Sequence, residues 1–383
     1  MTVRETPAAG ESATEQPSGD AATTGDADSP RDESVLILAD HPNAGKIERH
    51  YGPLADVTRE TTMVCIDGDD AVDGIRFREV PAPGHRLLGL PLLFLVGLVE
   101  ALRGEYDAVV SISLVPYGAF ALLAGRLTGT PVHLGIIGAD IDRHAEAWYG
   151  AAVRAAFRRF DSLSVPGSAH VRYLVAAGVD PDRVSVLTNA IDTGTYRPPA
   201  APDRDVDFVW VGRFSQEKAP VRFVEALAEL GERGREFDAV MLGDGDRMPA
   251  VRRALARHGL GARVELPGWV DDPVDYYRRS RVFVLTSQRE GLPLTLVEAM
   301  ATGVVPVVPP VGSVADVAED GHNAVVVPDR GAGSLADGMA RLLAEPDLCA
   351  ELAARAPDLR EDYSYDAARK DWRAILDLLW VQG

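Results

Sequence analysis

Residues Ser287–Gly303 read SQREGLPLTLVEAMATG, and this stretch determines how the rest of the chain is interpreted. The apolar run VFVL just before it predicts a strand, and the pattern that begins near Pro293 predicts a helix, whose first turn suits proline. A helix start presents backbone N–H groups and the positive end of the helix dipole, which favour a phosphate. Glu290 lies in the loop and Glu298 inside the helix, so we expect them to contact different parts of one ligand. An ionised carboxylate accepts two hydroxyl groups, as a sugar or a ribose diol offers. The alternative is that both carboxylates are solvated side chains.

A second loop carries two cations. VWVGRFSQEKAP (Val209–Pro220) predicts a strand that ends at Gly212, where glycine permits a tight turn. Arg213 and Lys218 follow on the same loop, and two converging cations would neutralise a bound diphosphate and the departing nucleotide. Lys218 is one of only three lysines in the chain, with Lys46 and Lys370. The alternative is that it is a solvated surface lysine.

Short apolar runs alternate with helical patterns on both sides of these loops, which favours parallel sheets with crossover helices. In the first half the runs that predict strands are Val35–Ala39, Met63–Ile66, Val109–Ile112, Val132–Ile137, Leu163–Val165 and Val184–Leu187, with helices over Leu92–Arg103 and Tyr117–Leu127. In the second half the predicted strands are Val206–Val211, Ala239–Leu242, Val264–Leu266, Val282–Leu285, Val304–Val308 and Val325–Val327. Helices are predicted there over Val221–Leu230, Pro249–Arg257, Leu294–Ala301, Leu335–Leu343 and Ala350–Ala356.

The alternation is interrupted once, by a proline-rich stretch at residues 195–205, which predicts a linker. We therefore expect an α/β fold of two doubly wound, Rossmann-like domains, at residues 34–194 and 206–360, that face a central cleft. In such sheets ligands bind beyond the carboxyl ends of the strands. Residues 361–383 predict an amphipathic helix, and residues 1–33 an acidic, disordered tail with few large apolar side chains.

The spacing of Glu290 and Glu298, with Gly291, Pro293 and the Glu-Ala-Met run, resembles the donor site of glycosyltransferase family 4, whose fold is called GT-B. By this resemblance Glu298 would hold the ribose hydroxyls and Glu290 the donor sugar. The backbone at Gly291 and Leu292 would meet the sugar or the diphosphate. The resemblance further implies donor contacts at Gly45, Gly212, Gly243, Gly268, Val270, Pro293 and Leu294, catalytic roles for Arg213, Lys218 and Asp140, and a last helix that crosses back onto the first domain. Gly243 and Gly245 either meet the donor or only serve a strand-end turn.

The same resemblance implies the reaction. A retaining glycosyltransferase would move a sugar from a nucleoside-diphosphate donor to a glycan or lipid-linked acceptor, with front-face attack and with the departing diphosphate taking the acceptor's proton. No metal and no cofactor would be required, because Arg213, Lys218 and the helix start supply the positive field.

One position departs from the family pattern. GIIGADIDRH (Gly135–His144) matches the family segment at Gly138 and Asp140, but Ile137 stands where a histidine is usual. In the family that histidine helps to place the donor sugar, and His144 and His41 are nearby candidates to replace it. The departure keeps two alternatives open: a non-catalytic protein that binds the nucleotide sugar or a partner, and a sugar-nucleotide epimerase of the same fold.

Composition narrows the functional classes. The net charge of -19 disfavours nucleic acid as a partner, since nucleic-acid binding needs a basic surface. Acid excess with few lysines is typical of proteins from salt-loving organisms, and arginine-biased codons in a GC-rich genome are the alternative. Cys65 and Cys349 are in no metal-like spacing, so neither a disulfide framework nor a zinc site is expected, and the protein is predicted to be cytoplasmic.

The apolar run Leu87–Val99 is too short to span a membrane as a helix. It predicts either a buried helix of the first domain or a contact with the membrane surface beside a lipid-linked acceptor. The second interpretation would make the protein peripheral on the inner face of the cell membrane.

Overall fold

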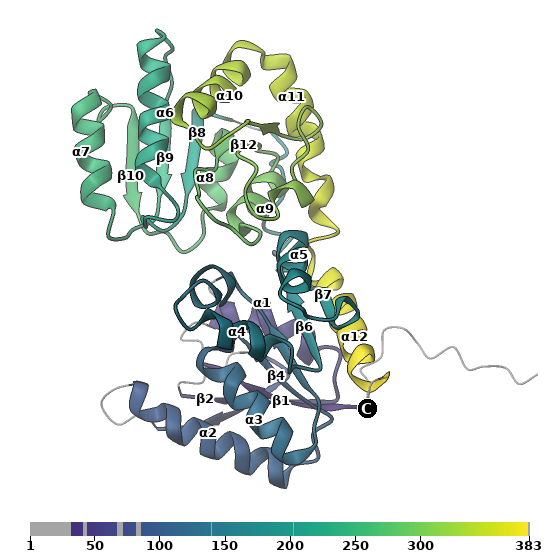
Figure 1. Cartoon of the computed structure of the whole chain (residues 1–383). Coiled ribbons are helices and arrows are strands. Elements are labelled where there is room, and N and C mark those ends of the chain that lie inside the picture. Colours follow the sequence, from purple (N-terminus) through teal and green to yellow (C-terminus); the bar gives the residue numbers. More distant parts are fainter. Residues whose placement is uncertain are drawn as a thin grey trace, which may run out of the picture.

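Two parallel sheets organise the chain in a computed structural model, which describes residues 32–40, 44–66, 72–81, 86–138, 140–201 and 203–381 (Figure 1). The predicted fold class is confirmed, since both sheets carry helices on their faces. The predicted tail at 1–33 lies almost entirely outside the described residues, and His41 lies outside them as well.

The first sheet has seven strands in the order β3-β2-β1-β4-β5-β6-β7, and each neighbouring pair is parallel. Its strands are β1 (Ser34–Leu38), β2 (Glu60–Cys65), β3 (Ile75–Glu79), β4 (Ala108–Ile112), β5 (Val132–Gly135), β6 (Ser162–Val165) and β7 (Val184–Val186). The helices between them are α1 (Ala44–Ala55), α2 (Arg86–Arg103), α3 (Ala119–Thr128), α4 (Gly150–Phe157) and α5 (Ser168–Ala176). The sequence did not predict β3, α1, α4 or α5.

The second sheet has six parallel strands in the order β10-β9-β8-β11-β12-β13. Its strands are β8 (Val206–Val211), β9 (Ala239–Leu242), β10 (Val264–Gly268), β11 (Ser280–Val284), β12 (Val305–Val308) and β13 (Val325–Val326). Its helices are α6 (Pro220–Glu232), α7 (Met248–His258), α8 (Val274–Arg279), α9 (Leu294–Ala301), α10 (Ala332–Ala344) and α11 (Pro346–Arg355). The predicted bounds of β8, β9 and α9 agree with these.

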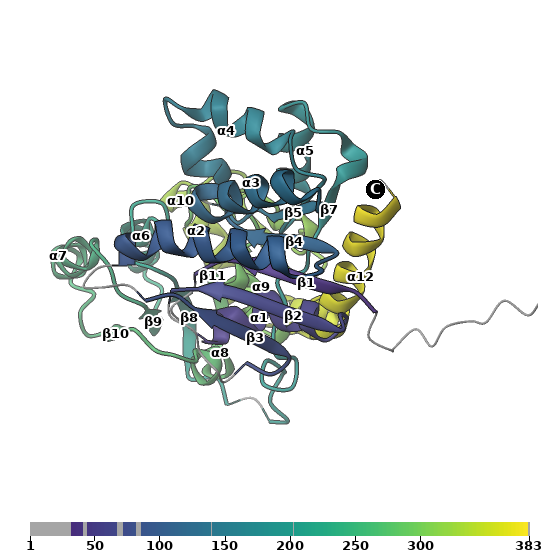
Figure 2. The same ribbon diagram turned by 90° about the horizontal axis from the view of Figure 1, so that it is seen from below.

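Both faces of the first sheet are buried, as the unbroken apolar runs require. Leu36 and Leu38 of β1 face the core that α2 and α3 cover, whereas Val35 and Ile37 face the core under α1. Figure 2 shows α2 and α3 on one side of this sheet. No helix within the described residues is long and apolar enough to cross a membrane.

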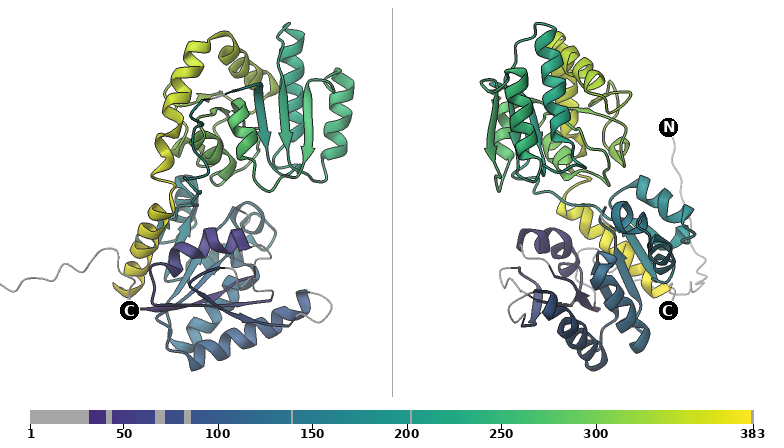
Figure 3. Two further views of the ribbon diagram at one scale, coloured as in Figure 1. Left: turned by 180° about the vertical axis from the view of Figure 1, so that it is seen from behind. Right: turned by 60° about the vertical axis from the view of Figure 1, so that its left-hand side comes forward.

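The last helix, α12 (Tyr365–Val381), returns to the first sheet (Figure 3). Trp372, Ile375, Leu376 and Leu379 are buried in the core that contains Val35 and Ile37, which confirms the predicted crossing. Under this helix the His133 ring lies 5.2 Å from the Trp372 ring. Burial lowers the pKa of His133 to about 3, so the ring is neutral.

The stretch predicted as a linker is only partly free of the second core. Tyr196 is buried there together with Ile191, and its hydroxyl donates a hydrogen bond of 3.0 Å to Asp272 in the second half. Arg204 donates to the Gly303 carbonyl at 2.7 Å. Residues 195–205 are therefore held against the second half of the chain at both ends.

Candidate active site

A cavity of about 530 Å³, within the size range of small-molecule sites, lies between the two sheets. It lies beyond the carboxyl ends of β8 and β9, since Val211 and Leu242, which end these strands, line it. Predicted site residues that line it are Gly45, Gly212, Arg213, Lys218, Gly243, Val270, Pro293, Leu294 and Glu298. Further lining residues, which the sequence did not predict, include Lys46, Arg49, Tyr196, Glu217, Trp269, Asp271 and Thr295.

The end of β8 and the loop after it are held in place by hydrogen bonds to the segment that follows β11. The Trp210 indole N–H donates to Thr286 Oγ1 at 2.8 Å, and the Thr286 hydroxyl donates to the Lys218 carbonyl at 2.7 Å. The Gln288 backbone N–H donates to the Glu217 carbonyl at 2.7 Å. These contacts fix the backbone of Lys218 beside the Glu290 loop, while Arg213 lies exposed at the cavity wall.

Lys218 and Glu290 form an ion pair. Lys218 Nζ lies 2.6 Å from Glu290 Oε1, and the two side chains are only 26% and 8% exposed. Lys218 reaches the cavity, whereas Glu290 is not among the residues that line it. The sequence analysis assigned both residues to the donor. It did not predict that their side chains form an ion pair with each other.

Glu298 lies inside α9 and at the cavity, as predicted, but its side chain is almost fully buried. Its side chain accepts a hydrogen bond of 3.2 Å from the buried Tyr277 hydroxyl. Burial raises the pKa of Glu298 to about 7, against the opposing effects of Arg49 and of the Tyr277 hydrogen bond. The carboxyl group is therefore poised between its two protonation states near neutral pH.

The start of α9 faces the cavity through Pro293, Leu294 and Thr295. Pro293 caps the helix with extended backbone (φ -72°, ψ 118°), so the helix begins one residue later, at Leu294. The helix start thus lies where a phosphate could receive backbone hydrogen bonds.

Three glycines named in the sequence analysis adopt backbone conformations that favour glycine. Gly243 and Gly245 have φ of 125° and 154°, and a Cβ atom would lie 2.0 Å from the Gly212 carbonyl oxygen and 2.5 Å from that of Phe214, respectively. Gly268 has φ of 88°, and its carbonyl accepts the Gly243 N–H at 2.8 Å. The strand-end turn alone thus accounts for the need for glycine at Gly243 and Gly245.

Gly291 and Leu292 lie behind the cavity. A Cβ atom on Gly291 would lie 2.9 Å from Pro166 Cγ and 3.0 Å from His170 Cε1, both in the first half of the chain. Leu292 is buried in the second core. Neither residue is among those that line the cavity, so packing between the two halves accounts for glycine at Gly291.

Helix α1 brings positive charge to the cavity from the first half. Gly45, which the resemblance implies as a donor contact, lies in the first turn of α1. Lys46 and Arg49 follow on the same helix and also line the cavity, where they face Arg213 and Lys218. Two of the three lysines in an acidic chain therefore meet at one cavity. The rarity of lysine was the signal that could have found Lys46.

Asp140 lies away from the cavity. Its side chain is 0% exposed and accepts hydrogen bonds from the Leu114 N–H at 2.9 Å and the Ser113 hydroxyl at 3.0 Å. Ser113 has φ of 78°, an uncommon conformation for a residue other than glycine, and burial raises the pKa of Asp140. This geometry does not support the expected catalytic role. The hydrogen bonds instead indicate that Asp140 stabilises the turn at Ser113.

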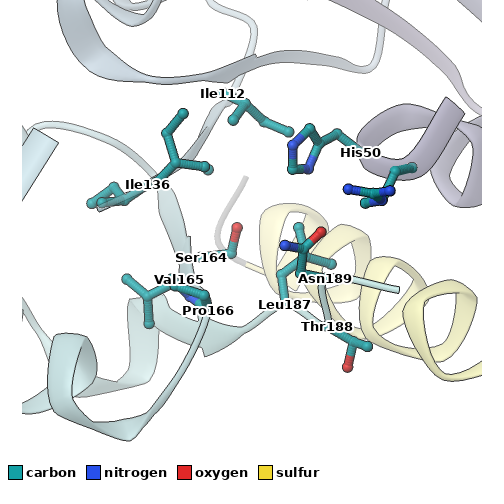
Figure 4. A pocket seen from close by; sticks show the side chains of 12 residues that line it. His50, Ile112, Ile136, Ser164, Val165, Pro166, Leu187, Thr188 and Asn189 are labelled. Carbon is teal, nitrogen blue, oxygen red and sulfur yellow. The ribbon is translucent and has the colours of Figure 1, made fainter. Parts of the chain in front are cut away.

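A smaller cavity, of about 50 Å³, lies at the carboxyl ends of β4, β5 and β6 (Figure 4). Ile137 lines it, together with His50, whose ring points into it, and Asn189. Arg49 lines both cavities and so lies between them. His144 lines neither cavity, and its ring nitrogen lies 2.7 Å from the Tyr149 hydroxyl.

No three His, Cys, Asp or Glu side chains gather as a metal site within the described ranges, and Cys65 and Cys349 are both free. The charged groups at the cavity are instead four cations and the carboxyl groups of Glu217, Asp271 and Glu298. This arrangement suits an anionic ligand that also offers hydroxyl groups.

Sequence comparisons identify two family profiles that follow each other along the chain. Residues 53–190 match the "Glycosyl transferase 4-like domain", and residues 195–359 match "Glycosyl transferases group 1". The second half of the chain is a group 1 glycosyltransferase domain, and the first half is a glycosyl transferase 4-like domain. Together the two profiles cover both sheets apart from β1. The cavity residues of the second half lie within the group 1 match, whereas Gly45, Lys46 and Arg49 precede the 4-like match.

The curated relatives are named as glycosyltransferases. The chain is 32% identical over 163 residues to alpha-D-kanosaminyltransferase of Streptomyces kanamyceticus, which covers 42% of each protein. It is 24% identical over 290 residues to the putative colanic acid biosynthesis glycosyltransferase WcaL of Salmonella typhimurium, which covers 71% of each. The chain spans about half the length of most curated relatives that it matches.

Solved structures of other proteins share the fold. HepE of Anabaena, solved in complex with UDP and glucose, superposes with a TM-score of 0.76 at 17% identity, over 90% of this chain and 99% of HepE. Sucrose-phosphate synthase of Thermosynechococcus elongatus superposes with a TM-score of 0.74 at 16% identity, over 92% of this chain and 100% of that protein. At these identities the likeness establishes the fold alone.

Proposed function

We propose that the chain transfers a sugar, with retention of configuration, from a nucleoside-diphosphate donor bound in the cavity between the sheets. The observation that carries this proposal is the convergence of Lys46, Arg49, Arg213 and Lys218 on one cavity that also contains Glu298. Four cations beside three carboxyl groups, in a chain of net charge -19, make this cavity suited to an anionic ligand. HepE, which shares the fold, has been solved with UDP-glucose.

Each part of the donor has a counterpart at the cavity. The diphosphate would lie between Arg213, Lys218 and the start of α9, and the ribose hydroxyls would bind Glu298 once its carboxyl group ionises. The base would lie along the segment Gly268–Val270, where the exposed Trp269 ring offers a stacking surface. The donor sugar would meet Glu290, which must then share or release Lys218.

The cations also suit the chemistry. Charge develops on the departing diphosphate as the glycosidic bond breaks, and fixed cations stabilise that charge most in the transition state. The acceptor would attack from the same face, and the departing diphosphate would take its proton. We infer that the protein's own cations replace a metal ion and that no cofactor is used.

We further propose a glycan or lipid-linked acceptor on the side of the smaller cavity. Leu88, Leu95 and Leu102 recur every seven residues along α2 and are exposed, while the opposite face of that helix packs on β1. Leu123 of α3 adds to this apolar surface. Such a surface would suit peripheral contact with the inner face of the membrane, and co-sedimentation with phospholipid vesicles tests it.

The domain division and the setting follow as proposals. We place the first domain at residues 34–194, the linker at 195–205, the donor-binding domain at 206–360 and the returning helix at 361–383. Acid excess with three lysines suits a cytoplasmic protein that works in high salt, where the Debye length is about 3 Å at 1 M.

The proposal is tested by incubating the purified chain in high salt with a panel of UDP, GDP, ADP and TDP sugars. Slow release of a nucleoside diphosphate, by transfer to water, from at least one donor is the expected result. Tight nucleotide binding without any turnover would favour the non-catalytic alternative, for which Ile137 in place of histidine is the supporting observation. Inversion at C2 of the sugar without release of nucleotide would favour an epimerase.

A further inference from the structure

The two halves of the molecule meet directly behind the proposed donor-sugar loop, at a contact made by Ser313 and Asp316 on one side and by the start of α5 on the other. Asp316 Oδ2 accepts the Ser168 backbone N–H at 2.7 Å, and Asp316 Oδ1 accepts the Ser168 hydroxyl at 2.5 Å. Ser313 Oγ accepts the Ala169 N–H at 3.0 Å. Figure 1 shows α5 at the junction of the two halves.

These hydrogen bonds cap a helix from outside its own domain. The residue before α5 is Gly167, which has no side chain with which to accept the first N–H groups of the helix. Asp316 and Ser313 supply the missing acceptors, and the carboxylate also lies favourably at the positive end of the helix dipole. The start of α5 therefore has these side-chain acceptors only while the two halves are together.

Glycine permits the close approach on both sides. A Cβ atom on Gly167 would lie 2.4 Å from Ser313 Cβ, although the φ of 177° would suit any residue. A Cβ atom on Gly291 would lie 2.9 Å from Pro166 Cγ. At both positions the need for glycine comes from the opposite half of the molecule, because neither φ lies in the left-handed region.

The contact is linked to both cavities. The Ser313 backbone N–H donates to the Gly291 carbonyl at 2.7 Å, and Gly291 follows Glu290 directly. On the other side, Pro166 lines the smaller cavity and is followed by Gly167. One set of short contacts thus joins the loop that carries Glu290 to the loop that borders the smaller cavity.

We propose that Asp316 and Ser313 are positioning residues, which act through Gly291 to set the Glu290 loop against the first domain. This inference rests on the proposed function, in that Glu290 must meet a donor sugar. Asp316 and Ser313 touch neither cavity, so they affect the binding of free nucleotide little and the alignment of donor and acceptor strongly. A displacement of about 1 Å at a reacting centre costs up to about 10²-fold in rate.

The contact itself is tested in the full chain by a disulfide. Ser168→Cys combined with Asp316→Cys should form a cross-link between the halves under mild oxidation, because the two side chains are in hydrogen-bond contact. Ser168→Cys combined with Asp329→Cys is the matched control. Asp329 lies just before α10 in the second half, where it accepts the Gly331 N–H at 2.6 Å. No more cross-link in the first pair than in the control would overturn the proposal.

The positioning role is tested by Asp316→Asn and Gly167→Ala, which weaken the contact from opposite sides. Asp329→Asn and Gly261→Ala are the controls, since a Cβ atom on Gly261 meets no atom within 4 Å. We expect kcat for hydrolysis of the best donor to fall about ten-fold or more in both contact variants, with the Kd for UDP within about two-fold of wild type. The controls should retain both values.

Equal kcat in contact variants and controls would contradict the positioning role, as would a loss of UDP affinity as large as the loss of kcat. A wild-type chain that hydrolyses no donor would contradict the proposed function instead. The disulfide yield needs no activity and reports on the contact alone, so the two failures are distinguishable.

Discussion

Replacing Glu290 by glutamine removes the negative charge that pairs with Lys218 but keeps nearly the same shape. The resemblance to family 4 assigns Glu290 to the donor sugar and Lys218 to the diphosphate. The structure adds that Lys218 Nζ lies 2.6 Å from Glu290 Oε1. A diphosphate that approaches Lys218 must therefore compete with Glu290. The substitution should tighten the binding of a free nucleoside diphosphate while it slows sugar transfer.

The size of the effect follows from the burial of the pair. With side chains 26% and 8% exposed, salt screens this pair less than a surface pair. A hydrogen bond to a charged group contributes about 1.5–3 kcal/mol, and the glutamine oxygen keeps part of it. We therefore expect UDP affinity to rise by about 1.5 kcal/mol, roughly ten-fold. Turnover of an intact donor should fall by about 10²-fold, because a contact that strengthens in the transition state is lost.

Calorimetric titration with UDP and steady-state hydrolysis of a donor measure the two effects separately. Glu217→Gln is the control, since Glu217 precedes Lys218 on the loop after β8 and lines the cavity. Its charge is exposed, so its loss should change affinity less than two-fold in high salt. If Glu290→Gln leaves UDP affinity unchanged or weaker, Lys218 does not bind the phosphates. The ion pair would then be structural.

Three further predictions concern single side chains. UDP affinity should rise with pH through about 7, because the ribose diol binds the ionised form of Glu298, and in Glu298→Gln the titration should lose that pH dependence. Lys46→Gln should weaken UDP binding about ten-fold and UMP binding much less, because Lys46 lines the cavity. The control is Lys370→Gln, at an exposed lysine on α12, which should change neither affinity. Equal effects of Lys46→Gln on both nucleotides would show that Lys46 does not bind the diphosphate. The free energy of unfolding should fall below about pH 6.5, by up to about 1.4 kcal/mol per pH unit, because unfolded His133 binds a proton that the buried ring, with a pKa of about 3, does not. Denaturant unfolding of His133→Gln between about pH 4 and 7 should show a smaller slope.

The sequence predicted the elements whose apolar runs are long and uninterrupted. β8 and β9 lie at their predicted bounds, because buried parallel strands are apolar on both faces. It missed β3, an edge strand that reads IRFRE and is mostly exposed, and α8, whose sequence VDYYRR is too short for a helical period. It also missed α1, in which Gly45 and Pro53 weaken the helical pattern.

At the site, sequence spacing identified groups on one segment but not groups that meet across segments. Glu298 and Arg213 reach the cavity as predicted. Arg49 could not be found, because its place between the cavities depends on how the two sheets face each other. Gly291 was interpreted as a ligand contact, whereas its nearest neighbours are Pro166 and His170 from the other half. Local sequence carries no signal for such contacts.

The central claim is that the cavity between the sheets binds a nucleoside diphosphate through cations from both halves. The most direct measurement is a calorimetric titration of the full chain in high salt with UDP, GDP and ADP, beside the double variant Lys46→Gln, Lys218→Gln. The account predicts saturable binding of at least one of the three, at micromolar to millimolar Kd, and a loss of about 10²-fold in the double variant. Absence of binding by all three at millimolar concentration, or equal binding by the double variant, would contradict it.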